Sequence, residues 1–189
     1  MKRIKGAIEM SLQTWFEKGL TPKEYMDTLE KHKDGFHAIY DTFSVPTDAI
    51  FTNKNIRAIV LAEPWCGHCM LNIPILLRIA EHANFDVRFL LRDENLELMD
   101  QYLTNGKSRT IPIVIFIDEN GEEVGKWGPL ADYTKTFMAP LRANLPEKGS
   151  PAYDEKFQEM ITFTAKAFSE DEKIWNGVYD SITETIRSI

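Results

Sequence analysis

The chain has 189 residues, of which 43% are hydrophobic, 27% charged and 11% aromatic. This composition is typical of a globular domain and excludes a disordered chain, a collagen-like chain and a small disulfide-stapled scaffold. Its 22 Lys and Arg stand against 29 Asp and Glu, giving a net charge of −7. Such an acidic balance argues against a nucleic-acid partner, because phosphate contacts need clustered cations.

Two further exclusions concern membranes and export. No run of 18 apolar residues occurs, so neither a membrane span nor a membrane partner is expected. The stretch Met1–Glu9 begins with basic residues, as a signal peptide does, but Glu9, Gln13 and Glu17 interrupt the apolar segment that such a peptide needs. We therefore expect a cytoplasmic location.

Residues 1–46 are predicted to form a helical N-terminal extension that packs on the core. The apolar residues of Leu12–Phe16 predict a short helix that ends near Gly19. Thr21–Glu24 has the pattern of a capping box with proline at the first helical position, and apolar residues follow it at helical spacing. Gly35 is a candidate break between two helices.

Residues 47–145 alternate between strand and helix patterns. The apolar run Ile56–Ala62 is typical of a buried parallel strand. Asn120-Gly121 is a strong hairpin signal between two strands. The other predicted elements are a helix over 66–82, a strand over 87–91, a helix over 95–103, strands over 113–117 and 122–127, and a helix from 132 to about 141 that Pro140 strains or ends. This order predicts an α/β fold with a mixed sheet and helices on both faces.

Residues 150–189 are predicted to form a C-terminal helical extension after a short linker. Ser150 and Pro151 suit the N-cap and first position of one helix, and a second helix is expected to begin near Asp171. Apolar stripes on both helices need a surface to cover, so we expect both extensions to pack on the middle segment. A docking or dimer surface, or a cover over the active site, is the alternative.

The only two cysteines, Cys66 and Cys69, stand three residues apart, directly after the buried strand and at the first turn of a helix. Unpaired N–H groups at a helix start carry partial positive charge, which lowers the pKa of a thiol placed there. Cys66 is therefore the expected nucleophile and the more exposed thiol. Cys69, one turn further on, is placed to attack the resulting mixed disulfide. His68 is expected to put a cation or a hydrogen-bond donor near the Cys66 sulfur.

Other interpretations of this pair stay open. Two buried and inert cysteines would have raised pKa values and no reactivity. A zinc or copper site would need a histidine ligand, and three histidines lack an obvious ligand spacing to the pair: His32, His37 and His82. Covalent haem attachment is excluded because Met70, not histidine, follows Cys69. No metal and no cofactor are expected.

The segment Pro64–Cys69 resembles the active site of thioredoxin-fold thiol–disulfide oxidoreductases. Its Cys-Gly-His-Cys form is the one found in protein disulfide isomerase domains, whereas thioredoxin itself usually has proline in the third place. Further matches are Pro74 in the active-site helix, Arg109–Pro112 as a cis-proline loop, the Asn120-Gly121 turn and Gly128 after it. The resemblance covers about residues 50–145 and implies a thioredoxin fold with extra N-terminal and C-terminal helices.

The resemblance also implies roles outside the cysteine pair. A cis bond before Pro112 would present the backbone of Ile111 to an extended substrate strand, although Pro112 can also simply begin a strand. Trp65 is expected to contact substrate on the active-site surface. Arg109 has two open interpretations, which are contact with a client carboxylate and capping of its own loop.

One position departs from the family pattern. The family usually places a buried acid six residues before the first cysteine, and here that residue is Val60. Glu63 is the nearest acid and a possible proton relay, although we expect it to be more exposed. Either the proton moves through Glu63 and water, or the resolving step is slow.

Together these patterns predict an enzyme that reduces or exchanges disulfides through Cys66 and Cys69. Its expected partners are disulfide-containing client proteins or low-molecular-weight disulfides, with a thiol or a reductase as electron donor. The reduction potentials of such pairs run from about −270 mV in thioredoxin to about −180 mV in the isomerase, and the motif points toward the isomerase end. The alternatives are a non-catalytic peptide-binding module and a redox sensor.

Overall fold

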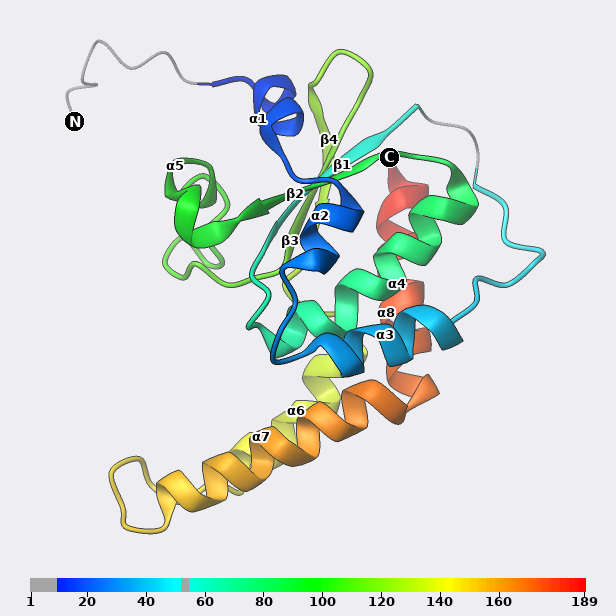
Figure 1. Cartoon of the computed structure of the whole chain (residues 1–189). Helices are drawn as coiled ribbons and strands as arrows, with labels where there is room; N and C mark the ends of the chain where they lie inside the picture. The colour runs from blue at the N-terminus through cyan, green and yellow to red at the C-terminus, as the bar shows by residue number, and fades with distance from the viewer. Residues whose placement is uncertain (1–9, 52–54) are drawn as a thin grey trace, which may run out of the picture.

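The computed structural model describes residues 10–51 and 55–189, so the basic start at Met1–Glu9 lies outside the described residues. The helices are α1 (Leu12–Lys18), α2 (Pro22–Asp27), α3 (Lys33–Thr42), α4 (Gly67–Ala83), α5 (Leu96–Met99), α6 (Asp132–Ala143), α7 (Tyr153–Glu170) and α8 (Glu172–Ser188), with a 3₁₀ turn, η1, at Arg92–Glu94 (Figure 1). None of these helices is long and apolar enough to cross a membrane.

The sheet has four strands in the order β2-β1-β3-β4: β1 (Arg57–Ala62), β2 (Val87–Leu91), β3 (Ile113–Ile117) and β4 (Glu123–Trp127). β1 and β2 are parallel, whereas β3 runs antiparallel to both β1 and β4. The central strands β1 and β3 are buried along almost their whole length, as their continuous apolar runs predict. The predicted α/β class, a mixed sheet with helices and extra terminal helices, is confirmed (Figure 1).

The first two helices, α1 and α2, begin where the sequence predicts. The Thr21 hydroxyl accepts the Glu24 N–H at 3.3 Å, and the Glu24 carboxylate accepts the Thr21 N–H at 2.7 Å, which confirms the capping box. Between α1 and α2, Leu20 pairs with Phe89 of β2 through two backbone hydrogen bonds of 2.8 and 2.9 Å. This short pairing covers the open edge of β2 and ties the N-terminal segment to the sheet.

Gly35 does not break the helix that contains it. α3 runs through Gly35, and the gap between helices falls earlier, over residues 28–32. A Cβ at position 35 would lie 2.5 Å from Sδ of Met70, so glycine allows α3 to approach α4 closely. The glycine therefore serves packing, which a local pattern does not reveal.

Three other element boundaries differ from the sequence prediction. The helix expected over 95–103 is reduced to η1 and the four residues of α5. α6 continues through Pro140 to Ala143. α7 begins two residues after Pro151, because Ser150 belongs to a turn in which its carbonyl accepts the Tyr153 N–H at 3.0 Å.

Both terminal segments contribute to one buried cluster. It contains Trp15 and Tyr25 from the N-terminal side and Trp175 and Ile182 from the C-terminal side, together with β1 and α4. α8 packs on α4 and β4, whereas α6 and α7 run alongside each other and project away from the sheet (Figure 1). The division of the chain into segments 1–46, 47–145 and 150–189 stays a prediction.

Candidate functional site

The two cysteines lie at the junction between β1 and α4. Cys66 is the N-cap residue of α4, and its sulfur accepts the backbone N–H of Cys69 at 3.4 Å. The Cys66 thiol also lies 3.8 Å from the carbonyl oxygen of Ile111, to which it donates. Both cysteines are free thiols. The sulfur of Cys66 thus takes the place that a serine or aspartate oxygen usually has at a helix start.

The environment of Cys66 favours its thiolate. A hydrogen bond from the Cys69 thiol is the main cause that lowers the pKa of Cys66 to about 7, and the backbone N–H groups of Cys69 and His68 act in the same direction. Burial opposes this shift in the pKa, and the positive charge of the Arg92 guanidinium lowers the pKa slightly further. A substantial fraction of Cys66 is therefore ionised at neutral pH.

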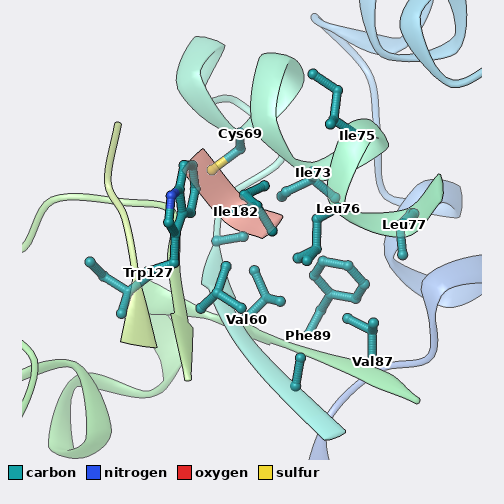
Figure 2. Close-up of a cluster of buried hydrophobic side chains, with 14 of the residues drawn as sticks. Val60, Cys69, Ile73, Ile75, Leu76, Leu77, Val87, Phe89, Trp127 and Ile182 are labelled. Atoms are coloured by element: carbon teal, nitrogen blue, oxygen red, sulfur yellow. The ribbon is translucent and has the colours of Figure 1, made fainter. Parts of the chain in front are cut away.

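Cys69 has the opposite environment. Its side chain is 1% exposed, against 8% for Cys66, so Cys66 is the more accessible thiol, as expected. Burial raises the pKa of Cys69, and the neighbouring Cys66 raises it further. Figure 2 shows Cys69 within the buried cluster that also contains Val60, Trp127 and Ile182. Its proton is thus retained until a mixed disulfide forms at Cys66.

Of the two expectations for His68, a cation or a hydrogen-bond donor near the Cys66 sulfur, the environment of its ring favours the donor. Burial, and secondarily the charge of Arg142, lowers the pKa of His68 to about 4. The imidazole faces the ring of Phe168 from α7, with 6.1 Å between ring centroids. His68 therefore supports the Cys66 thiolate through its backbone N–H, and its neutral ring belongs to the contact between the motif and α7.

Arg92 is a site residue that the sequence analysis missed. Its guanidinium lies 5.0 Å from the ring centroid of Trp65, whose side chain is half exposed, and it donates to the carbonyl of Arg109 at 3.1 Å. Arg92 directly follows β2, whose last residue, Leu91, pairs with Ala62 at the end of β1. The sequence did contain a signal for Arg92, which is its position directly after a predicted strand. Parallel neighbouring strands end at the same edge of the sheet, so a residue that follows β2 lies near the residues that follow β1.

The loop before β3 completes the wall beside Cys66. The Ile111–Pro112 peptide bond is cis, as the resemblance implied, and the Gly128–Pro129 bond is cis as well. A Cβ at Gly128 would lie 2.3 Å from the carbonyl oxygen of Pro112, so the chain at these two points is in direct backbone contact. Ile111 is buried with its carbonyl directed at the Cys66 sulfur.

Arg109 is paired with a carboxylate of its own chain. Its guanidinium forms two hydrogen bonds to the Asp100 carboxylate, at 2.7 and 2.9 Å. This fork-to-fork pairing braces the loop that leads to Ile111, in line with the loop-capping interpretation. Both side chains of the pair are 47% exposed, so contact of Arg109 with a client carboxylate stays a prediction.

Glu63 is buried, contrary to the expectation that it would be more exposed. Its side chain is 5% exposed, and its carboxylate accepts the Asp93 N–H at 2.8 Å. Burial is the main cause that raises the pKa of Glu63. The parallel pairing of β1 with β2 places this carboxylate under the turn after β2, and that contact could not be read from the charge pattern alone.

Tyr25 of α2 is a second residue that the sequence analysis missed. Its ring is fully buried and stacks on Phe89, which pairs with Val60 across the sheet. Its hydroxyl has no hydrogen-bond partner within the described part of the chain. Burial raises the pKa of Tyr25 far above its usual range, and the two cysteines and Glu63 add to this shift. The phenol thus stays protonated beside the apolar position where the family usually has an acid.

Over residues 10–51 and 55–189, no three His, Cys, Asp or Glu side chains gather as ligands. His68, the histidine within the motif, has its ring beside that of Phe168.

A cysteine pair at the start of a helix, a cis-proline loop facing the first sulfur and a mixed four-stranded sheet together define a thioredoxin-like protein. Residues 19–143 match the sequence model of the family described as Thioredoxin. Because this match spans more than half of the chain, the protein belongs to that thioredoxin family. No protein with a curated description matches the chain.

Solved structures share the fold at low sequence identity. A protein of unknown function from Pseudomonas aeruginosa is 15% identical, with a TM-score of 0.60 and coverage of 93% of this chain and 98% of that one. An HIV epitope-scaffold is also 15% identical, with a TM-score of 0.63 and coverage of 95% and 98%. Such coverage includes most of the terminal helices, so the extensions belong to the shared fold.

Proposed function

We propose that the protein is a thiol–disulfide oxidoreductase that uses Cys66 as nucleophile and Cys69 as resolving thiol. The observation that carries this proposal is that the pKa values of the two thiols are shifted in opposite directions. The pKa of Cys66 is lowered to about 7 at the helix start, and burial raises the pKa of Cys69. A reactive thiolate beside a protonated reserve thiol is what two-step disulfide exchange requires.

The exchange proceeds in two balanced steps. The Cys66 thiolate attacks one sulfur of a client disulfide, which forms a Cys66–client disulfide and releases the other client sulfur as a thiolate. Cys69 then loses its proton and attacks the Cys66 sulfur, which forms the Cys66–Cys69 disulfide and releases the second client thiolate. The client gains two electrons and two protons, and a thiol or a reductase returns the chain to its dithiol form.

The proton of Cys69 needs an acceptor for the second step. Glu63 is a candidate because its backbone and its carboxylate both affect the pKa of Cys69. In addition, the Cys66 N–H donates to the Glu63 carbonyl at 3.2 Å. A buried carboxyl with a raised pKa accepts a proton more readily than an exposed one. Glu63 therefore replaces the acid that is absent at Val60.

Substrate contact is assigned to the surface around Cys66. Trp65 presents a half-exposed ring there, and the backbone of Ile111 is placed to pair with an extended client strand beside the sulfur. Disulfide-containing proteins and low-molecular-weight disulfides are both possible clients. A cytoplasmic location would supply the reducing thiols, and it stays a prediction.

The test is a disulfide-exchange assay with the full chain. The wild type should reduce a protein disulfide repeatedly in the presence of a low-molecular-weight thiol. Cys66→Ser should abolish exchange, and Cys69→Ser should stop after one step with the client attached to Cys66. Equilibration in graded thiol buffers then gives the potential of the pair, near −270 mV for a reductase and about −180 mV for an isomerase-like role.

A binding module or a sensor would behave differently. If Cys66→Ser retains client binding and the wild type shows no exchange, the binding-module alternative replaces the enzyme. If the wild type shows no exchange but its hydrogen-exchange pattern in the terminal helices changes between the dithiol and disulfide forms, the sensor alternative replaces it.

A further inference from the structure

The cysteine motif forms one wall of a groove of about 360 Å³. Both sequence neighbours of Cys66, Trp65 and Gly67, line the groove together with His68. The facing wall is α7, through Phe157, Ile161 and Thr164. Cys66 is not itself in the lining, but both its sequence neighbours are, and successive Cα atoms are only about 3.8 Å apart, so the groove lies next to the residue that would hold a client.

The lining of the groove is mainly apolar and aromatic. Phe157 is 39% exposed and Trp65 is 50% exposed, so two large rings stand open to solvent at its edges. Thr164 is 5% exposed, and its hydroxyl has no partner among the residues that the structure describes. This hydroxyl is buried at the base of the lining, so the contact that the groove offers there is chiefly apolar.

The charge that lines the groove is of one sign, positive. Its described lining contains no carboxylate, although the chain carries 29 Asp and Glu, and Lys31 supplies the cation at one end. His32 lies beside Lys31 and packs over Gly67, where an added Cβ would be 4.0 Å from the His32 ring. Burial lowers the pKa of His32, so its ring adds apolar surface at neutral pH.

We propose that this groove binds a bulky apolar side chain of a polypeptide client, within two residues of the client cysteine that joins Cys66. This inference rests on the proposed function and names its substrate class. A small charged thiol would need several ionic partners, and the groove offers one. An apolar peptide side chain fills the lining, and an acidic neighbour is favoured over a basic one by Lys31.

The test measures the rate of the first exchange step with the full chain carrying Cys69→Ser. The probes are short peptides whose single cysteine is linked to thionitrobenzoate, with Leu, Ser or Lys beside the cysteine. Attack by Cys66 on the peptide sulfur leaves the peptide on Cys66 and releases the coloured thiolate. The Leu peptide should react about ten times faster than the Ser peptide, a difference of about 1.4 kcal/mol that burial of such a side chain supplies. The Lys peptide should be slowest.

Two substitutions locate this preference in the groove. Ala165→Trp places a large ring in the lining and should bring the Leu-to-Ser rate ratio close to one, and Phe157→Ala should lower the same ratio. Phe163→Ala is the matched control, because Phe163 lies on the same helix, is 54% exposed and is outside the groove. It should leave the ratio unchanged.

The outcomes separate the two proposals. Equal rates for the Leu and Ser peptides in the unsubstituted groove would overturn the groove assignment and leave the exchange activity standing. A ratio that drops equally in Phe163→Ala would do the same. No release of the coloured thiolate from any probe, including the free symmetrical reagent, would instead overturn the proposed function.

Discussion

The ring of Tyr25 stacks on the ring of Phe89, with 4.4 Å between centroids and 13° between ring planes. Phe89 is the β2 partner of Val60, the position at which thioredoxin-like proteins usually have a buried acid. A residue of the N-terminal segment thus packs against the part of the sheet that lies below the cysteine pair. The fold replaces a buried charge there with an aromatic stack and a buried phenol.

Tyr25→Phe should raise the free energy of unfolding by about 1 kcal/mol. The hydroxyl of Tyr25 is buried without a partner in the described chain, and such a group costs about 1–3 kcal/mol. Urea unfolding measures the change. Tyr102→Phe is the control and should not stabilise, because the Tyr102 hydroxyl donates to Glu123 at 2.6 Å. A clear loss of stability in Tyr25→Phe would show that its hydroxyl has a partner.

Cys69→Ala should raise the pKa of Cys66 from about 7 toward the ordinary thiol range. The hydrogen bond from the Cys69 side chain is the largest cause that lowers this pKa. Cys69→Ser keeps a side-chain donor and should raise the pKa less. The measurement is the rate of iodoacetamide alkylation of Cys66 against pH. Identical profiles for the Ala and Ser variants would show that the backbone N–H groups alone stabilise the thiolate.

His68 should stay neutral down to acidic pH. Its pKa of about 4 in the folded chain is below the ordinary value of 6.5, so between these values the unfolded chain binds more protons. The free energy of unfolding should therefore rise as pH increases from about 4 to 6.5, by up to about 3 kcal/mol from this group. His68→Gln should reduce that slope. Ring resonances of His68 that titrate near pH 6.5 would contradict its burial against Phe168.

Glu63→Gln should slow the second exchange step. The variant keeps an oxygen for the Asp93 N–H but removes the carboxylate that we propose as acceptor of the Cys69 proton. General-base groups commonly contribute about 100-fold or more to such a step. The measurement is the lifetime of the Cys66–client mixed disulfide after rapid mixing, with Glu119→Gln, at an exposed turn residue, as control. An unchanged lifetime would assign the proton to water.

Gly128→Ala should destabilise the fold by about 2–4 kcal/mol. Gly128 has φ of +120°, and an added Cβ would lie 2.3 Å from the backbone oxygen of Pro112, which cannot move aside as a flexible side chain can. Gly149→Ala isolates the conformational cost alone, because Gly149 has φ of +92° with nothing within 4 Å of the added Cβ. Chemical unfolding of both variants gives the comparison. Equal losses would mean that the loop at Pro112 shifts freely.

Local sequence patterns predicted much of the fold and the position of Cys66 at the start of a helix. The strands at 87–91 and 113–117 have the bounds that their apolar runs indicate, and the Thr21–Glu24 capping box forms as predicted. The place of Cys66 as N-cap of α4 was predictable because the strand before it and the helix after it both have strong patterns. Such signals involve residues within a few positions of one another, so they survive without knowledge of the fold.

Other features depend on segments that are far apart in the sequence. Glu63 is buried and accepts the N–H of Asp93, which follows β2. His68 lies against the ring of Phe168 from α7, and burial is the main cause that lowers its pKa. Arg92 approaches Trp65 only through the parallel pairing of β1 with β2. The burial and the charge state of each of these side chains depend on such distant neighbours, so they cannot be predicted from the residue type alone.

The position of the thiol pair could thus be read from the amino-acid order, because a cysteine at a helix start is governed by the backbone around it. Other surroundings of that pair could not: the buried phenol of Tyr25, the guanidinium of Arg92 and the groove against α7 all follow from long-range packing. These groups come from distant parts of one chain, and only the folded arrangement brings them within reach of Cys66.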